Sequence, residues 1–175
     1  MKIVELNRSE YQNYEFDCKY TTKAYFDVSI KKKKDISISI KRKKYRRKQD
    51  KGFVAHLFEP FIEKPQSFAI FDRRKLVAVI EGSLETWNNR YRVWNLNVDK
   101  KYRKEGLGSM LFKHMEKVAK ELGARVIILE VQSCNDPAIN FYTKQGLHFV
   151  GLDTMAYTNQ DIQNKEVRLE MGKRL

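Results

Sequence analysis

The chain has 175 residues, of which 42% are hydrophobic, so it is long enough and apolar enough to fold around a core. Its formal net charge is +13, and no apolar run is long enough to cross a membrane as a helix. The first residues lack the apolar stretch of a signal peptide, and the two cysteines form neither a disulfide framework nor a metal-binding spacing. We therefore expect a single cytoplasmic domain over residues 1–175, without a bound metal.

The positive charge is concentrated in residues 31–51. Twelve lysines and arginines lie in this segment against two aspartates, so it carries +10 of the net charge. A basic patch of this kind attracts nucleic acid, an anionic membrane or another polyanion. The alternative is a solvated hairpin that protrudes from the domain without a polyanionic partner.

The N-terminal third shows weak periodicity. Four elements are predicted before residue 41: a strand at 2–6, a helix near 9–18, and strands at 26–30 and 36–40 joined by a turn at 31–35. The apolar alternation in the last two predicts one buried face on each strand. Residues 41–66 show no clear periodicity, and the apolar residues within 53–62 predict a short helix or a lid.

From residue 67 the pattern predicts a mixed sheet. The expected elements are strands at 67–71, 76–84, 90–98 and 126–129, a helix at 106–122, a second helix after residue 135, and strands near 147–157 and 167–173. Gly123 is expected as a left-handed cap, and Asp136 as the N-cap of the second helix, with Pro137 after it and Gly146 at its end. Strand, helix and strand in succession predict a parallel pair with a right-handed crossover. The fold class is therefore α/β (α+β), with a central sheet of six to seven strands.

The turn between the strand at 90–98 and the helix at 106–122 has features of an anion-binding loop. Arg103 and Lys104 supply positive charge, and Gly106 and Gly108 let the backbone approach a ligand closely. The helix start adds N–H groups and the positive end of the helix dipole. A pyrophosphate would fit here, and the alternative is an ordinary strand-to-helix turn with solvated lysines.

Two motifs that follow one another along the chain resemble those of the GNAT acetyltransferases. Arg103-x-x-Gly106-x-Gly108 resembles their acetyl-CoA pyrophosphate loop, and Asn135-x-x-Ala138-x-x-Phe141-Tyr142-x-x-x-Gly146-Leu147 resembles their second motif. The resemblance covers about residues 67–173. It implies a GNAT-type acyltransferase fold with helices on both faces of the sheet, an acetyl-CoA-binding core at 67–175 and a variable N-terminal part at 1–66.

A narrower resemblance is to bacterial streptothricin acetyltransferases, which acetylate an amine of an antibiotic. It is carried by Trp87-Asn88, by Leu129-Glu130-x-Gln132 with Asn135, and by Asp153-Thr154-Met155-x-Tyr157-x-Asn159. That group has acidic residues on the central strand where Trp94 and Asn95 stand in this chain. The basic segment at 31–51 is also unusual for an enzyme that handles a cationic antibiotic.

The resemblance implies how acetyl-CoA would bind. The backbone of Leu96 and Val98 would pair with the pantetheine amides and polarise the thioester carbonyl, and backbone amides from Lys104 to Ser109 would bind the pyrophosphate. The full set of implied cofactor contacts is Leu96, Asn97, Val98, Arg103, Lys104, Glu105, Gly106, Leu107, Gly108, Ser109, Asn135, Ala138 and Tyr142.

The reaction implied is direct attack of an amine on the thioester. An amine with a pKa of about 10.4 is almost fully protonated at pH 7, so a base is useful, and Glu130 is our first candidate. Tyr142 matches the family's acid, which protonates the departing thiolate. Glu81, Glu85 and Asp153 are further carboxylates that could act as the base or bind a cationic substrate. Trp94 would either wall the acceptor site or belong to the core.

The sequence thus predicts an acetyl-CoA-dependent N-acetyltransferase that acts on a primary amine of a small molecule, with a streptothricin-like antibiotic as one candidate. The alternatives are a nucleic-acid- or ribosome-associated binding protein on the same scaffold, and an acetyltransferase of a protein amine. Whether the protein forms a homodimer stays open.

Overall fold

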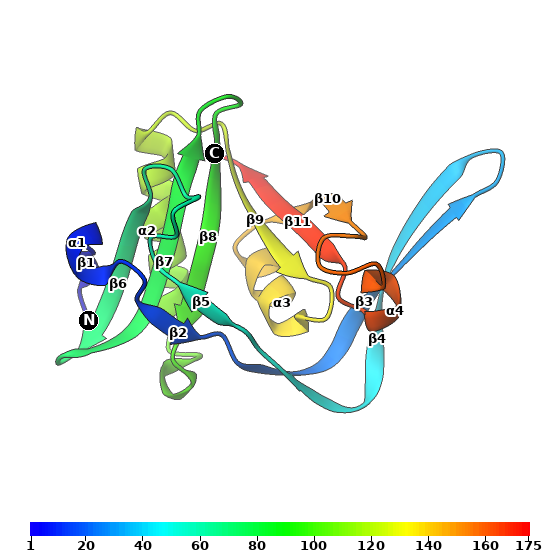
Figure 1. Cartoon of the computed structure of the whole chain (residues 1–175), viewed down its shortest axis with the longest axis horizontal. Helices are drawn as coiled ribbons and strands as arrows, with labels where there is room; N and C mark the ends of the chain where they lie inside the picture. The colour runs from blue at the N-terminus through cyan, green and yellow to red at the C-terminus, as the bar shows by residue number, and fades with distance from the viewer. The chain divides into compact units, whose positions relative to one another are not determined.

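The computed structural model describes all of residues 1–175, and the chain divides into two compact units (Figure 1). The first unit consists of residues 1–18, 53–129 and 173–175. The second consists of residues 19–52 and 130–172. The expectation of a single domain over residues 1–175 stays a prediction.

The chain forms eleven strands, four α-helices and one 3-10 helix, and β2 to β8 follow one another without a helix between them. In order they are β1 (Ile3–Glu5), α1 (Arg8–Tyr11), β2 (Glu15–Asp17), β3 (Tyr20–Lys32), β4 (Ile36–Lys51), β5 (Val54–His56), β6 (Gln66–Asp72), β7 (Lys75–Glu85), β8 (Arg90–Val98), η1 (Lys100–Tyr102), α2 (Leu107–Glu121), β9 (Val126–Gln132), α3 (Asp136–Lys144), β10 (His148–Asp153), α4 (Asp161–Asn164) and β11 (Arg168–Arg174).

Seven of these strands form one mixed sheet, in the order β1-β6-β7-β8-β9-β11-β10. Strands β6, β7 and β8 pair antiparallel, and β8 pairs with β9 in parallel. These pairings confirm the predicted mixed sheet and the predicted parallel pair whose connection runs through α2. Two smaller sheets pair β2 with β5 and β3 with β4.

The sheet of the first unit is covered on both faces, which explains its nearly continuous apolar strands. Residues paired across two strands share a face, so the pair Phe68 and Ile80 marks one face and the pair Ala69 and Val79 marks the other. The Phe68 ring lies 4.4 Å from the ring of His114, so the first face carries α2. The second face carries a buried cluster that also includes Leu6, Phe16, Leu57 and Phe58.

The structure corrects two predictions in the N-terminal part. The helix predicted near 9–18 is limited to α1, because Asn13 is left-handed at φ 61° and the chain then enters β2. No helix forms within 53–62, where Phe58 has a φ of 57° and Pro60 follows. Leu57, Phe58 and Ile62 are buried, while Phe53 and Phe61 are exposed.

The turn within 31–35 is confirmed, since β3 and β4 pair antiparallel on either side of it. Strand β4, however, runs on to Lys51 through a segment in which no periodicity predicted a strand. The expected buried face is also wrong near the turn, because Ile36 and Ile38 are 68% and 56% exposed. Strands β3 and β4 form a two-stranded ribbon whose tip is the turn. Farther from the turn, Val28 is 5% exposed, so other residues cover only the base of this ribbon.

In the C-terminal third, the N-cap of α3 differs from the prediction. Asn135, not Asp136, caps the helix, because its Oδ1 accepts a hydrogen bond from the backbone N–H of Ala138 at 3.2 Å. Gly146 follows the helix at φ 87°, as its predicted stop. Strand β10 is shorter than expected, and α4 was not predicted.

None of the helices combines the length and the apolar character that a membrane crossing requires.

Candidate functional site

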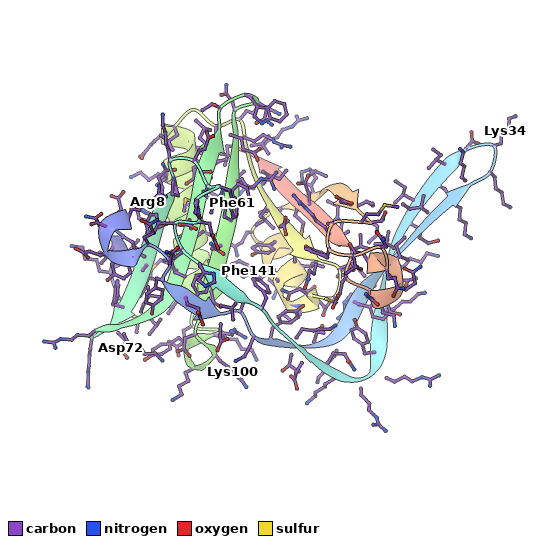
Figure 2. The ribbon with its side chains drawn as sticks, in the orientation of Figure 1. Arg8, Lys34, Phe61, Asp72, Lys100 and Phe141 are labelled. Carbon is purple, nitrogen blue, oxygen red and sulfur yellow. The ribbon has the colours of Figure 1, made fainter.

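The loop after β8 is held against the end of that strand. Asp99 accepts a hydrogen bond at Oδ1 from the backbone N–H of Lys101 at 2.9 Å, which caps η1. Figure 2 labels Lys100 in this turn. Arg103 donates from Nε to the carbonyl oxygen of Val98 at 2.9 Å. The guanidinium group is therefore fixed beside the start of the loop.

The backbone of the loop contains two residues with positive φ just before the start of α2. Lys104 and Gly106 are both left-handed, at φ 71° and 86°, and such turns orient successive N–H groups toward an anion. A Cβ atom at Gly106 would meet nothing within 4 Å, so the space above it is open. The first bond inside α2 runs from the N–H of Met110 to the carbonyl of Gly106 at 2.9 Å, and no side chain caps the helix. The backbone N–H groups of Leu107 and Gly108 therefore lie at a helix N-terminus, where they could donate hydrogen bonds to an anion.

Strand β8 has one edge open beyond Val93. The N–H of Asp99 donates to the carbonyl of Val77, so odd-numbered residues at this end of β8 face β7. The backbone groups of Leu96 and Val98 therefore point to the opposite edge. Pairing with β9 on that edge covers only residues 90–93. The geometry fits the predicted pairing of these two residues with an extended amide-containing ligand.

Trp94 occupies a β-bulge where this open edge begins. Glu81 pairs with Asn95 and Gly82 with Val93, so Trp94 is the extra residue on β8. Its indole N–H donates to Oγ of Ser83 at 2.9 Å, and its ring lies 5.6 Å from that of Phe61, which Figure 2 labels. Trp94 is 36% exposed, which favours the predicted wall over a place in the core.

Glu81 is a fully buried carboxylate whose oxygens are already occupied. Oε1 accepts hydrogen bonds from the backbone N–H of Phe58 at 2.9 Å and from Oγ of Ser67 at 2.7 Å. Oε2 accepts from Nδ2 of Asn95 at 2.9 Å. With 0% exposure and three donors, the Glu81 carboxylate is enclosed and fully hydrogen-bonded, and its predicted role in the reaction stays a prediction.

Glu85 is held by two arginines on β8. Arg92 lies 2.7 Å from one carboxylate oxygen, and Arg90 lies 3.0 Å from the other. Burial alone would raise the pKa of Glu85, but the hydrogen bonds and charges of Arg92 and Arg90 outweigh it and hold the pKa below its usual value. Because both oxygens are engaged, Glu85 has little charge to offer a cationic ligand.

Glu130 is an exposed residue near the end of β9, within the second unit. Its Oε2 is 3.0 Å from Nε of Arg168, and its Oε1 accepts from the hydroxyl of Tyr157 at 3.2 Å. Burial, followed by the charge and hydrogen bond of Glu130, raises the pKa of Tyr157. Arg168 was not predicted as a partner of Glu130, because the two residues are far apart in the sequence and no local pattern indicates the contact.

Helix α3 carries the remaining candidates of the second unit. Tyr142 is half-buried, and its ring lies edge-on to Phe141 at 5.3 Å. Asn135 and Ala138 form the capped first turn of the same helix. Asp153 is exposed at the end of β10, where its Oδ1 accepts from the N–H of Met155 at 2.9 Å.

The predicted residues therefore fall into two groups. The first unit brings together the loop, the open edge of β8, Trp94, Glu81 and Glu85. The second unit contains Glu130, Asn135, Ala138, Tyr142 and Asp153. Phe61, beside Trp94, was considered only as part of a lid, and its contact with the tryptophan could not be read from spacing. No group of histidine, cysteine and carboxylate side chains is arranged to hold a metal.

The chain is similar to known proteins both in sequence and in structure. A streptothricin acetyltransferase from Streptomyces lavendulae is 37% identical over 75 residues, which make up 43% of this chain and 40% of that protein. The chain thus matches about two fifths of the length of that relative.

Two solved structures have the same fold over almost the whole chain. Nourseothricin acetyltransferase superposes with a TM-score of 0.78 at 24% identity, covering 99% of this chain and 97% of that one. A Bacillus anthracis str. Ames protein in complex with acetyl coenzyme A gives a TM-score of 0.74 at 22% identity, with the same coverage of each chain.

The profile of the acetyltransferase (GNAT) family matches residues 35–147. The match begins earlier and ends earlier than the resemblance expected over 67–173, but it contains the loop after β8, β9 and α3. It spans more than half of the chain, and the mixed sheet described above agrees with it. The chain therefore belongs to the acetyltransferase (GNAT) family, whose cosubstrate is acetyl-CoA.

Proposed function

We propose that this chain is an acetyl-CoA-dependent N-acetyltransferase that transfers an acetyl group to a primary amine of a small molecule by direct attack. The proposal rests on one observation above all. The first unit combines a left-handed, glycine-containing loop at a helix N-terminus with an adjacent open strand edge. Residues 1–175 would act together as one domain.

The residues of the loop fit the charged part of acetyl-CoA. The amides of Leu107 and Gly108 and the side chains of Arg103 and Lys104 would bind the pyrophosphate, because they combine directed N–H donors with positive charge. Leu96 and Val98 would hydrogen-bond the pantetheine amides along the open edge of β8. When bound, acetyl-CoA supplies the acetyl group as a thioester.

The chain's own residues would move two protons. Glu130 would take a proton from the substrate ammonium, directly or through water, so that the neutral amine can attack, while Arg168 and Tyr157 orient the Glu130 carboxylate. Tyr142 would donate a proton to the departing sulfur. A phenol with a pKa of about 10 suits this role, because a thiol has a pKa of about 8.5 and the transfer is close to balanced.

The acceptor is proposed from the relatives and from the charges that remain available. The Streptomyces lavendulae relative carries the name streptothricin acetyltransferase, which makes a streptothricin-like antibiotic the first acceptor to test. Glu130 and Asp153 are exposed and would attract a cationic amine, whereas Glu81 is buried and Glu85 is paired with two arginines. An amine of a protein is the second acceptor class, favoured by the basic segment 31–51, which would give the enzyme a polyanionic partner.

The test is acetyl transfer by the purified full-length chain. Acetyl-CoA is incubated with streptothricin, a polyamine or a basic peptide, release of free thiol is followed, and the products are identified by mass spectrometry. Transfer to one of these amines, above a reaction without acceptor, is the expected result. Thiol release that no acceptor accelerates, together with unmodified amines, would contradict the proposal.

A further inference from the structure

The ladder between β3 and β4 contains a large irregularity. Thr22 pairs with Gln49, but the next pair joins Ala24 to Lys44, so Lys23 alone faces the four residues 45–48. An ordinary bulge places two residues opposite one. Here β4 arches away from β3 and leaves a hollow, lined by Lys23, Ala24, Arg42, Lys44, Tyr45, Arg46, Arg47 and Lys48.

The walls of this hollow are strongly basic. Six of its eight residues are lysine or arginine, and Arg42 is neutralised by Asp136, whose two carboxylate oxygens lie 2.6 and 3.0 Å from its guanidinium nitrogens. The other five form no ion pair and are exposed. A concave surface with several uncompensated cations is suited to phosphate groups.

The ring of Tyr45 packs against other side chains of the second unit. Its ring lies 4.6 Å from that of Tyr25, and the Nζ atom of Lys165 lies 5.6 Å from its centre. Because the ring is packed between these groups, it supports the hollow from within. The ring is therefore engaged by Tyr25 and Lys165, and no base stacking on Tyr45 is inferred.

A second group of cations lies at the tip of the same ribbon. Residues 31–34 are four exposed lysines, and Figure 2 shows Lys34 at the tip with its side chain directed away from the ribbon. Eight strand positions separate Ala24, at the hollow, from Lys32, at the tip, which corresponds to about 26 Å. A small anion would contact only one group, whereas a nucleic-acid strand carries regularly spaced phosphates that reach both.

We infer that the hollow opposite Lys23 and the lysines of the ribbon tip together form a sequence-independent binding surface for the phosphate backbone of a nucleic-acid strand. This surface lies within the second unit and does not depend on acetyl transfer. It gives the charged segment a defined site in place of a diffuse patch.

The experiment measures fluorescence anisotropy of a labelled single-stranded RNA of mixed sequence, titrated with the full-length protein across a salt series. The hollow variant combines Lys44→Gln, Arg46→Gln, Arg47→Gln and Lys48→Gln. A matched variant removes the same charge from exposed residues of the first unit, through Lys2→Gln, Arg74→Gln, Lys113→Gln and Lys120→Gln. Circular dichroism and thermal unfolding check that both variants are folded.

The expected result is tight binding at low salt that weakens steeply as salt rises. The hollow variant should lose about tenfold or more in affinity, and its slope of log K against log salt should flatten by about 3, since each phosphate contact on a single strand contributes about 0.7. The matched variant should stay within about threefold of the wild type.

Three results would overturn the inference. One is an equal loss in the two variants, which would mean that net charge alone attracts the RNA. Another is equally tight binding of polyglutamate or of phosphatidylserine vesicles, which would assign the surface to an acidic protein or a membrane. The third is competition by inorganic phosphate at concentrations that leave ionic strength unchanged, which would assign the hollow to a small anion.

Discussion

Asn95 on β8 donates a hydrogen bond from Nδ2 to Oε2 of Glu81 on β7, at 2.9 Å. The same nitrogen lies 3.2 Å from the carbonyl oxygen of His56 on β5, so this amide joins three strands. A carboxylate at position 95 could donate neither bond and would bring a second negative charge to Glu81. Asn95, at a position where the resemblance led us to expect an acidic residue, therefore pairs with Glu81.

Glu81→Gln should destabilise the fold. In either orientation of the new amide, an NH₂ group would face an existing donor, either Asn95 or the pair Phe58 and Ser67. Leaving buried donors unmatched should lower the free energy of unfolding by about 1–3 kcal/mol, measured by urea denaturation. Glu10→Gln, at an exposed site, is the control. Unchanged stability with lost acetyl transfer would instead place Glu81 in the chemistry.

Glu85→Gln should make stability less dependent on pH. The folded-state pKa of Glu85 is depressed, so its contribution is present above the unfolded value of about 4.3 and is lost as the pH falls through the lower folded value. At neutral pH the variant should lose about 1–3 kcal/mol of unfolding free energy, because both arginines lose their charged partner. Urea denaturation from neutral pH down to about pH 3 should show the two proteins converging. A gap that stays constant over this range would exclude a role of the carboxylate charge.

Sequence pattern predicted the part of the fold where local signals and burial agree. Strands β6, β7 and β9 contain nearly continuous apolar runs, since both faces of their sheet are covered, and helix α2 shows clear apolar periodicity. The exposed isoleucines of β4 gave a false signal of burial, because alternation does not reveal whether a second layer covers the strand. Residues 41–51 gave no signal, since a strand built of lysines and arginines has no apolar face.

The site was only partly predictable for a related reason. Gly106 could be assigned to the loop because a positive φ just before a helix favours glycine, and this constraint is local in sequence. The partners that occupy Glu81 and Glu85 could not, because these contacts depend on strand register. The β-bulge at Trp94 likewise depends on pairing between β7 and β8, and not on any pattern within β8 alone.

Tyr142→Phe should slow acetyl transfer without weakening cofactor binding. Loss of the phenolic proton donor should lower kcat by about 100-fold or more, while KM for acetyl-CoA changes little, because the ring is retained. Steady-state kinetics give both quantities, with Tyr14→Phe as a control at an exposed tyrosine. A normal kcat in Tyr142→Phe would remove this residue as the acid.

Glu130→Gln should lower kcat by about 100-fold or more and remove the acid limb of the pH–rate profile, if Glu130 is the base. Glu170→Gln is a matched control, because Glu170 also contacts Arg168, at 3.4 Å. The control should keep both its rate and its pH profile. Similar losses in the two variants would indicate that these carboxylates only position Arg168.

The most direct test of the account is calorimetric titration with acetyl-CoA. Gly106→Trp would fill the open space at the start of α2, while Gly123→Trp places the same side chain at another left-handed glycine with open surroundings, after the end of the helix. Backbone strain is thus matched, and thermal unfolding verifies it. The account predicts micromolar binding by the wild type and by Gly123→Trp, and no measurable binding by Gly106→Trp. Equal binding by all three proteins, or no binding by the wild type at millimolar acetyl-CoA, would contradict the assignment of the loop.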